Sequence, residues 1–144
     1  MAIALRAAEF EPYAELLRHQ AEHRSGQCGA TCSFVGTLRD FNEGDAVRAM
    51  TLEHYPGMTE RALERIVAEA QARWAFQDAL VIHRVGDILP GQPIVLVAVW
   101  SSHRGAAFDA CRHIMEELKH RAPFWKKETL AEGERWVEKI TEGY

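Results

Sequence analysis

Four short segments combine side chains that could do chemistry with the turns or helix ends that would expose them. Residues 36–40 lie where a strand would give way to a loop, and residues 101–105 lie between a strand and a helix. Lys119 lies near the end of that helix, and residues 124–128 follow the proline that would end it. Basic side chains occur in all four segments, so the chemistry they suggest is the binding of an anion.

Each of these basic residues has a specific use with an anion. The forked guanidinium of Arg39 could hold a phosphate or a carboxylate. His103 and Arg104 would sit at a helix N-terminus, whose free N–H groups and dipole favour phosphate. A lysine close to other cations, such as Lys119, could have a lowered pKa and act as a base or nucleophile. Taken singly, each could equally be structural or a solvated surface residue.

The charge distribution supports a local anion site. The chain has 17 Lys+Arg and 21 Asp+Glu, a formal net charge of −4, which argues against bulk nucleic-acid binding. Residues 119–127 nevertheless contain four Lys/Arg and no acid. Such a patch in a mildly acidic chain suggests an anionic ligand. A solvated helix C-terminus, which favours cations anyway, is the alternative.

Length and hydropathy suggest a small cytoplasmic protein. The 144 residues suit one domain, residues 1–144, with one core. No apolar run approaches the roughly 18–20 residues that a membrane-spanning helix needs. The first residues lack the basic start and cleavage site of a signal peptide, so we expect a cytoplasmic location and no membrane partner.

The cysteines do not form a recognisable metal or disulfide pattern. There are three, and an odd number without framework spacing argues against a disulfide scaffold. Cys28 and Cys32, if both lie on one strand, would share a face about 13 Å apart, at ~3.3 Å per residue, which is too far for one metal ion. We expect small core residues, with a reactive thiol as the alternative. The chain also lacks a P-loop and a dinucleotide fingerprint, so no metal or cofactor is expected.

The elements that must position these residues follow from hydrophobic periodicity. Apolar residues at three- and four-residue intervals predict helices over residues 59–74 and about 107–118, the second capped by Ser101 or Ser102 and ended by Pro123. A short helix at residues 11–23 is also expected. Strands are predicted, with a hairpin turn at 41–45, over residues 28–38, 46–54, 79–85 and 94–100 and near 135–138.

Hairpin-paired strands with two main helices inserted predict an α+β fold with a mostly antiparallel sheet. His83 and Arg84 lie in the middle of a predicted strand, and we interpret them as structural. His54 and Tyr55 are assigned to the core or to an interface, and Phe124 and Trp125 to the core. From the residues alone, the sequence predicts an α+β domain with an anion site.

At these positions the chain resembles the catalytic, or large, subunits of molybdopterin synthase. The matching stretches are FVGTLRDFNEGD, LEHYPGM, VIHRVGDILPGQ, SSHRGAAFDACRHIMEELKHRAPFWKKE and GERWVE. They occur in the family's order and cover most of residues 30–138. The first 25 residues and the tail after Glu138 match less clearly. The resemblance implies the family's hammerhead-like form of the α+β fold.

The resemblance implies a sulfurtransferase of molybdenum cofactor biosynthesis. Its substrate would be cyclic pyranopterin monophosphate, and its sulfur donor the thiocarboxylated C-terminal glycine of a small ubiquitin-like subunit. Two sulfur transfers would build the dithiolene of molybdopterin without a metal or redox cofactor. Lys119 and Lys126 would be catalytic. Substrate contacts would come from Thr37, Leu38, Arg39, His103, Arg104, Lys119, Lys126, Lys127 and Glu128.

Helix length leads to an expectation about assembly. His103 and Lys119 bracket one predicted helix, and 16 steps of ~1.5 Å place their backbones about 24 Å apart. If both ends contact one small ligand, a second copy must supply one of them. We therefore expect a two-fold homodimer. The resemblance implies that this dimer lies within a heterotetramer that includes the small subunit. Arg39, Lys119 and Lys126 would come from one chain, and His103 and Arg104 from its neighbour.

Two other classes of function compete with an enzyme. A non-catalytic docking module for a ubiquitin-like tail would keep the partner groove but would not need the two lysines. A phosphate- or nucleotide-binding regulator would bind its ligand without a partner protein. Two separate anion sites on one chain compete with the shared site.

Overall fold

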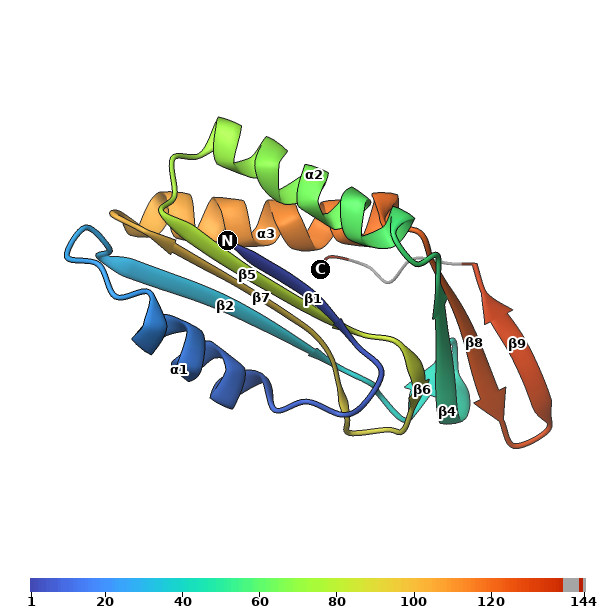
Figure 1. Cartoon of the computed structure of the whole chain (residues 1–144). Coiled ribbons are helices and arrows are strands. Elements are labelled where there is room, and N and C mark those ends of the chain that lie inside the picture. Colours follow the sequence, from blue (N-terminus) through green and yellow to red (C-terminus); the bar gives the residue numbers. More distant parts are fainter. Residues whose placement is uncertain (139–142, 144) are drawn as a thin grey trace.

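The computed structural model describes residues 1–138 and 143 and shows an α+β fold (Figure 1). The three helices lie in two groups on either side of a sheet, and a second sheet stands at one end of the first. In chain order the elements are β1 (Ala2–Arg6), α1 (Pro12–Glu22), β2 (Ala30–Thr37), β3 (Phe41–Asn42), β4 (Asp45–His54), α2 (Met58–Arg73), β5 (Asp78–Arg84), β6 (Gly86–Ile88), β7 (Pro93–Ser101), α3 (Arg104–Arg121), β8 (Phe124–Leu130) and β9 (Gly133–Val137).

The first sheet has the strand order β1-β5-β7-β2 and is covered on both faces. Side chains alternate across a strand, so a strand covered on both faces must be apolar throughout. In β7, Val95, Val97 and Val99 pack into a core cluster with α2 and α3. The intervening Leu96 and Ala98 pack on the opposite face, in a cluster that includes Leu16 of α1. The continuous run of apolar residues in this strand is therefore explained.

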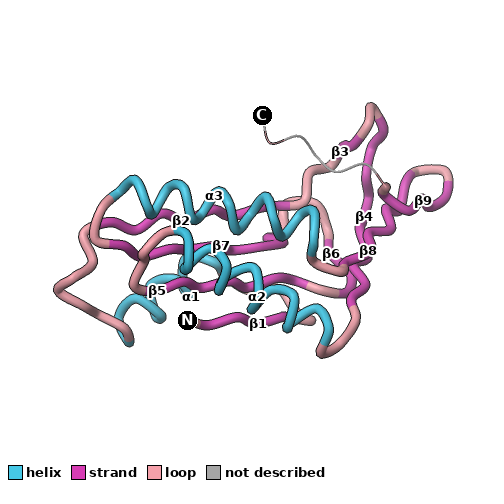
Figure 2. Tube along the Cα trace, turned by 90° about the horizontal axis from the view of Figure 1, so that it is seen from above, coloured by secondary structure: helices cyan, strands magenta, loops and turns pink. Residues whose placement is uncertain are grey.

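The second sheet has the order β3-β4-β8-β9, and β6 also pairs with β4. Figure 2 shows it beyond the ends of α2 and α3. Its β3–β4 hairpin turns at Glu43 and Gly44, whose φ angles are 50° and 83°. A two-residue hairpin turn favours positive φ at both positions, which glycine adopts readily. A hairpin turn within residues 41–45 is thus confirmed, but it connects β3 to β4, whereas the predicted strand before it, β2, pairs with β7 in the other sheet.

The predicted fold class is confirmed: every strand pair is antiparallel except β1 with β5, among the described residues. The sequence analysis did not predict β1, β3, β6 or β8. The predicted serine cap is wrong, because His103 is the N-cap residue of α3 and makes no side-chain cap bond. The Ser101 hydroxyl instead donates to the His103 carbonyl, and the Ser102 hydroxyl accepts from Gln77 at 2.8 Å.

The predicted shared face of Cys28 and Cys32 is also wrong. Cys28 precedes β2, which begins at Ala30, and it packs against the cluster on the α1 side of the sheet. Cys32 packs against the cluster on the α2 and α3 side. The assignment of Trp125 to the core is wrong, since 42% of it is exposed. Tyr55 is 54% exposed, so of its two predicted places, the core and an interface, it is not in the core.

The end of α3 follows the prediction. Ala122 is extended, with φ −74° and ψ 132°, as expected for the residue before Pro123. The chain therefore turns from α3 directly into β8, which places Lys119 and Lys126 near each other. Among the described residues, no helix has the length and apolarity needed to cross a membrane.

Candidate functional site

A cavity of about 490 Å³ opens between β2, the C-terminal end of α3 and β8. It lies at the junction of the two sheets, and its wall is therefore formed by residues from several elements. Apolar side chains make most of its surface, and a few basic and acidic groups face into it. Of the predicted site residues, it is lined by Thr37, Leu38, Arg39, Lys119, Lys126 and Glu128.

The two lysines come from different elements and meet in this cavity. Lys119 lies in the last turn of α3, and Lys126 is the third residue of β8. Both line the cavity, and they are close enough for the charge of Lys119 to act on Lys126. Burial, assisted by the positive charge of Lys119, lowers the pKa of Lys126 to about 8, even though nearby Glu128 opposes the shift. Lys126 can therefore exchange a proton near neutral pH.

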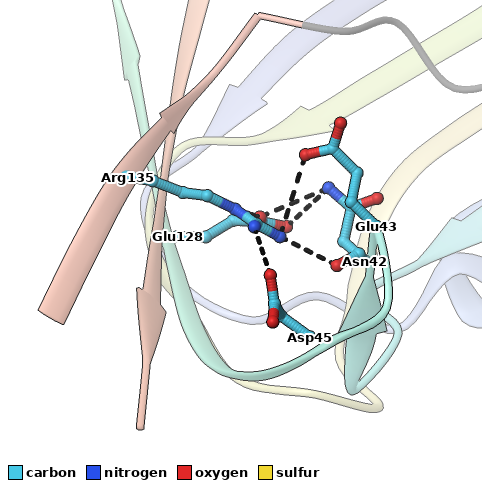
Figure 3. Close-up of polar contacts among 5 residues, drawn as sticks. All are labelled: Asn42, Glu43, Asp45, Glu128 and Arg135. Carbon is cyan, nitrogen blue, oxygen red and sulfur yellow. Dashed lines mark hydrogen bonds and ion pairs between the residues drawn. The ribbon is translucent and has the colours of Figure 1, made fainter. Parts of the chain in front are cut away.

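Glu128 is held in place by a network at the base of the cavity (Figure 3). It is only 4% exposed, and its carboxylate accepts two bonds from the Asn42 amide, at 3.1 and 3.2 Å. The Arg135 guanidinium donates to Glu128 at 2.9 Å, to Asp45 at 2.7 Å and to the Asn42 carbonyl at 2.8 Å. A buried carboxylate needs such partners. The network also ties β9 to the β3–β4 hairpin.

Three predicted residues lie at the end of β2 and in the loop after it. Leu38 is buried in a core cluster, and its backbone bonds to Gln92 and Gly91 fix the loop. Arg39 is exposed, and its guanidinium lies 4.7 Å from the centre of the Phe41 ring. It makes no ion pair with any residue of the described chain. The guanidinium of Arg39 is therefore available to an anion.

Of the four cations in the basic segment 119–127, two face the cavity and two face away from it. Arg121 pairs with Glu69 and, at 3.0 Å, with Glu117 on the surface. Lys127 points away from Lys126 because successive strand residues face opposite sides. It pairs with Glu134 at 3.2 Å and does not line the cavity. Two of the four cations therefore face the cavity.

His103 and Arg104 lie at the other end of α3 and are exposed. The helix runs unbroken from Arg104 to Arg121, so 16 steps of ~1.5 Å again give about 24 Å between His103 and Lys119. Neither residue lines the cavity that contains the lysines. Within one chain, the structure does not bring the two ends of the predicted site together.

His83 lines the cavity, although the sequence analysis interpreted it as structural. Its Nδ1 donates to the Arg84 carbonyl at 2.8 Å, and its ring stacks on Phe124 with centroids 4.1 Å apart. Burial lowers the pKa of His83 to about 3, so the ring is neutral. Its position in the middle of a strand gave no signal for this role. The wall also includes Phe34, Phe41, Met50, Ile94, Met115 and Glu116.

This arrangement can hold a flat, anionic ligand. The cations Arg39, Lys119 and Lys126 would attract negative charge, and the partly buried setting strengthens that attraction relative to water. The stacked His83 and Phe124 rings provide an apolar wall. One lysine that titrates near pH 8 can give or accept a proton.

Comparison with known proteins finds relatives along nearly the whole chain. The family model described as MoaE protein matches residues 7–121. A Pseudomonas aeruginosa protein named molybdopterin synthase catalytic subunit is 54% identical over 138 residues, covering 96% of this chain and 91% of that protein. The structure of a molybdopterin biosynthesis MoaE protein from Burkholderia ambifaria is 50% identical, with a TM-score of 0.81, covering 98% of this chain and 92% of that chain.

A more distant structure has the same fold. It is the complex of subunits 1 and 2 of molybdopterin-converting factor from Helicobacter pylori, with a TM-score of 0.79 at 22% identity. The match covers 95% of this chain and 90% of that chain.

Proposed function

Because the chain belongs to the MoaE protein family, we propose that it is the catalytic subunit of a molybdopterin synthase. It would transfer sulfur from the thiocarboxylated C-terminal glycine of a small ubiquitin-like subunit to cyclic pyranopterin monophosphate. The product would be the dithiolene of molybdopterin, for molybdenum cofactor biosynthesis. The observation that carries the proposal is the pair of lysines from two elements in one cavity, in a chain 54% identical to a protein of that name.

The charges of the cavity suit this reaction. The pterin phosphate and the glycine thiocarboxylate are both anions and repel each other. Arg39, Lys119 and Lys126 would reduce that repulsion and hold the two reactants together. Lys119 would transfer a proton or engage the carrier's terminal carbonyl, and Lys126 would stabilise negative charge on the pterin intermediate. Thr37 and Leu38 would form the wall beside them.

Glu128 and Lys127 have different parts in this proposal. Glu128 is already satisfied by Asn42 and Arg135, so its main effect would be on Lys126, whose pKa it raises. Lys127 faces the other side of β8 and would meet substrate only from outside the cavity of its own chain. Lys126 and Lys127 thus differ in role although they are adjacent.

The proposal includes a homodimer with shared sites. Phosphate would be held by Arg39 of one chain and by His103 and Arg104 of its neighbour. The support is the length of α3, about 24 Å between His103 and Lys119, against a pterin monophosphate on the order of 10 Å long. A two-fold axis would generate two such sites.

We further propose that the chain binds the small subunit and forms a heterotetramer with it. The same proposal places the protein in the cytoplasm, as a single domain over residues 1–144. A Helicobacter pylori chain of this fold is found in a complex of two converting-factor subunits, which supports a protein partner. The biosynthetic role named for the relatives supports a cytoplasmic location. A mere docking module would not need two lysines that face the same cavity.

Reconstitution tests the proposed function directly. The purified chain, thiocarboxylated small subunit and cyclic pyranopterin monophosphate are expected to yield dithiolene product, measured by its conversion to a fluorescent oxidised pterin. Small subunit ending in an ordinary carboxylate is the matched control, since it lacks the sulfur to transfer. Tight binding of both partners without product would favour the docking module. Binding of the pterin without the small subunit's involvement would favour a regulator.

The pH dependence of this reaction should report Lys126. Its pKa is lowered to about 8, so the ammonium form predominates below that pH and is lost above it. If the cation stabilises the intermediate, kcat/KM should fall roughly tenfold per pH unit well above the pKa. Lys126→Arg keeps the charge at every accessible pH, because arginine has a pKa above about 12.

In the Lys126→Arg variant the alkaline decline should therefore move to higher pH, even if its maximum rate is lower. An unchanged alkaline decline in this variant would assign the titration to another group.

A further inference from the structure

A second cluster of reactive side chains lies on the other side of the first sheet. His19 lies in the last turn of α1, His23 is the C-cap residue that follows this helix, and Asp78 is the first residue of β5. One potential ligand atom from each lies within 4.8 Å of the other two. None of the three lines the cavity that contains the lysines. In Figure 1, α1 covers the face of the sheet opposite α2 and α3.

We propose that His19, His23 and Asp78 bind one divalent transition-metal ion, with Zn²⁺ best matched to the ligands. Two imidazoles and one carboxylate form a common zinc set, with a fourth position for water or another ligand. Histidines four residues apart on a helix project from the same face, so α1 can present both to one ion. This pattern was visible in the sequence, but Asp78 is 59 residues from His19 and only folding brings it there.

Hydrogen bonds hold two of the three ligands, His23 and Asp78, by the polar atom that the metal would not use. His23 Nδ1 bonds to the His19 carbonyl at 2.8 Å, and a carbonyl can only accept. The proton is therefore on Nδ1, and Nε2 keeps its lone pair for a metal. Asp78 Oδ1 accepts from the Ala79 N–H at 2.9 Å and faces the amino group of Met1 at 3.1 Å. Partners of this kind orient metal ligands and fix their tautomers.

His19 Nε2 and Asp78 Oδ2 lie 2.6 Å apart and are joined through the proton of a hydrogen bond. A metal ion would replace that proton. Ligand atoms around one Zn²⁺, each about 2.0–2.1 Å from it, lie roughly 3.3 Å from one another. The pair must therefore open slightly, and His23 must move inward. His23 is exposed and follows the last residue of α1, but its ring stacks on the His19 ring with centroids 4.0 Å apart, so the His23 side chain must leave this stacked position to reach the ion.

Space for the remaining coordination position exists beside the cluster. A cavity of about 440 Å³ is lined by His23, Asp78 and Cys28, among others. Water could occupy the fourth position, and the Cys28 thiol borders the same space. The bound ion would connect α1 to β5 and so stabilise the packing of this helix on the sheet.

The competing explanation is that His19 and Asp78 form a simple hydrogen bond with no metal. The two explanations differ in whether His23 is needed. The bond needs no third residue, whereas the metal site does. The matched control is His120, which is exposed and makes the same contact, Nδ1 to the carbonyl four residues back, at 2.7 Å. His120 belongs to no cluster of three metal-binding side chains among the described residues.

Zinc titration of the full chain, with any purification tag removed, tests the proposal by calorimetry and thermal unfolding. We expect one ion per chain and a higher Tm with zinc. His23→Gln should weaken zinc binding at least about tenfold and abolish the Tm increase, while leaving the metal-free Tm unchanged. His120→Gln should bind zinc like the unmodified protein. Absence of stoichiometric binding, or equal affinity in His23→Gln, would overturn the proposal.

Cobalt substitution adds a structural readout. Co²⁺ in the site should show the visible absorption of a four- or five-coordinate ion, and this absorption should be lost in Asp78→Asn. A sulfur-to-cobalt charge-transfer band that disappears in Cys28→Ser would identify the thiol as the fourth ligand, and its absence would assign that position to water. These measurements do not use sulfur transfer, so their outcome is independent of the proposed function.

Discussion

Lys119→Ala is expected to lower the rate of dithiolene formation by about 10²–10⁴-fold, the range for loss of a positioned proton-transfer group. The rate would be measured in single turnovers with saturating thiocarboxylated small subunit. The amine is the part of Lys119 that reaches Lys126 in the cavity, and no other described lysine lines that space. Alanine also removes one of the cations that would hold two anions together.

The variant should nevertheless fold. Lys119 is only half-buried and lies in the last turn of α3, where alanine is an excellent helix former. Its Tm should stay close to that of the unmodified chain. Arg121→Ala is the matched control, because it removes a cation from the same turn that pairs with Glu69 and Glu117 outside the cavity. Arg121→Ala should keep turnover near normal, and equal losses in both variants would reject a specific role for Lys119.

Mixed dimers are expected to recover activity from two nearly inactive parents. In a heterodimer of Lys119→Ala with His103→Ala, one shared site combines both substitutions and the other has neither. A purified heterodimer, made with a different tag on each chain, should therefore show roughly half the activity of the unmodified dimer. The physical basis is the ~24 Å between the ends of α3, which one small ligand cannot span.

A second heterodimer controls for nonspecific rescue. Lys119 and Lys126 line the same cavity of one chain, so combining Lys119→Ala with Lys126→Ala leaves one lysine missing from each site. This pairing should stay nearly inactive. If the Lys119→Ala and His103→Ala heterodimer were no more active than its parents, the two ends of α3 would serve separate sites.

The sequence predicted the elements whose local pattern is strong. A hairpin turn was predicted within residues 41–45, where the structure has it at Glu43 and Gly44, and apolar spacing marked α2 and α3 to within a few residues. By contrast, β8 has the sequence FWKKETL, which has no clean alternation of apolar and polar residues. It is a strand because β4 and β9 pair with it on both sides. Such pairing depends on residues far away in the chain.

The same contrast applies to the residues of the site. The types of residue in the basic segment indicated an anion site, and their match to known relatives indicated which lysines to consider. The sequence of the segment could not show which of its side chains point into the cavity. Lys126 and Lys127 are adjacent and chemically identical, and only the pairing of β8 turns the first into the cavity and the second toward Glu134.

By itself, then, the sequence determined the α+β class, the main helices and the presence of cations where an anion would bind. Periodicity and turn chemistry act over a few residues, so they can be read without a fold. The tertiary structure decided which cations face inward, that His83 is a neutral wall of the cavity, and that Glu128 is secured by Arg135 and Asn42. It also joined His19 to Asp78. Burial, the pKa of Lys126 and ligand geometry depend on distances between elements remote in the chain, and folding alone sets those distances.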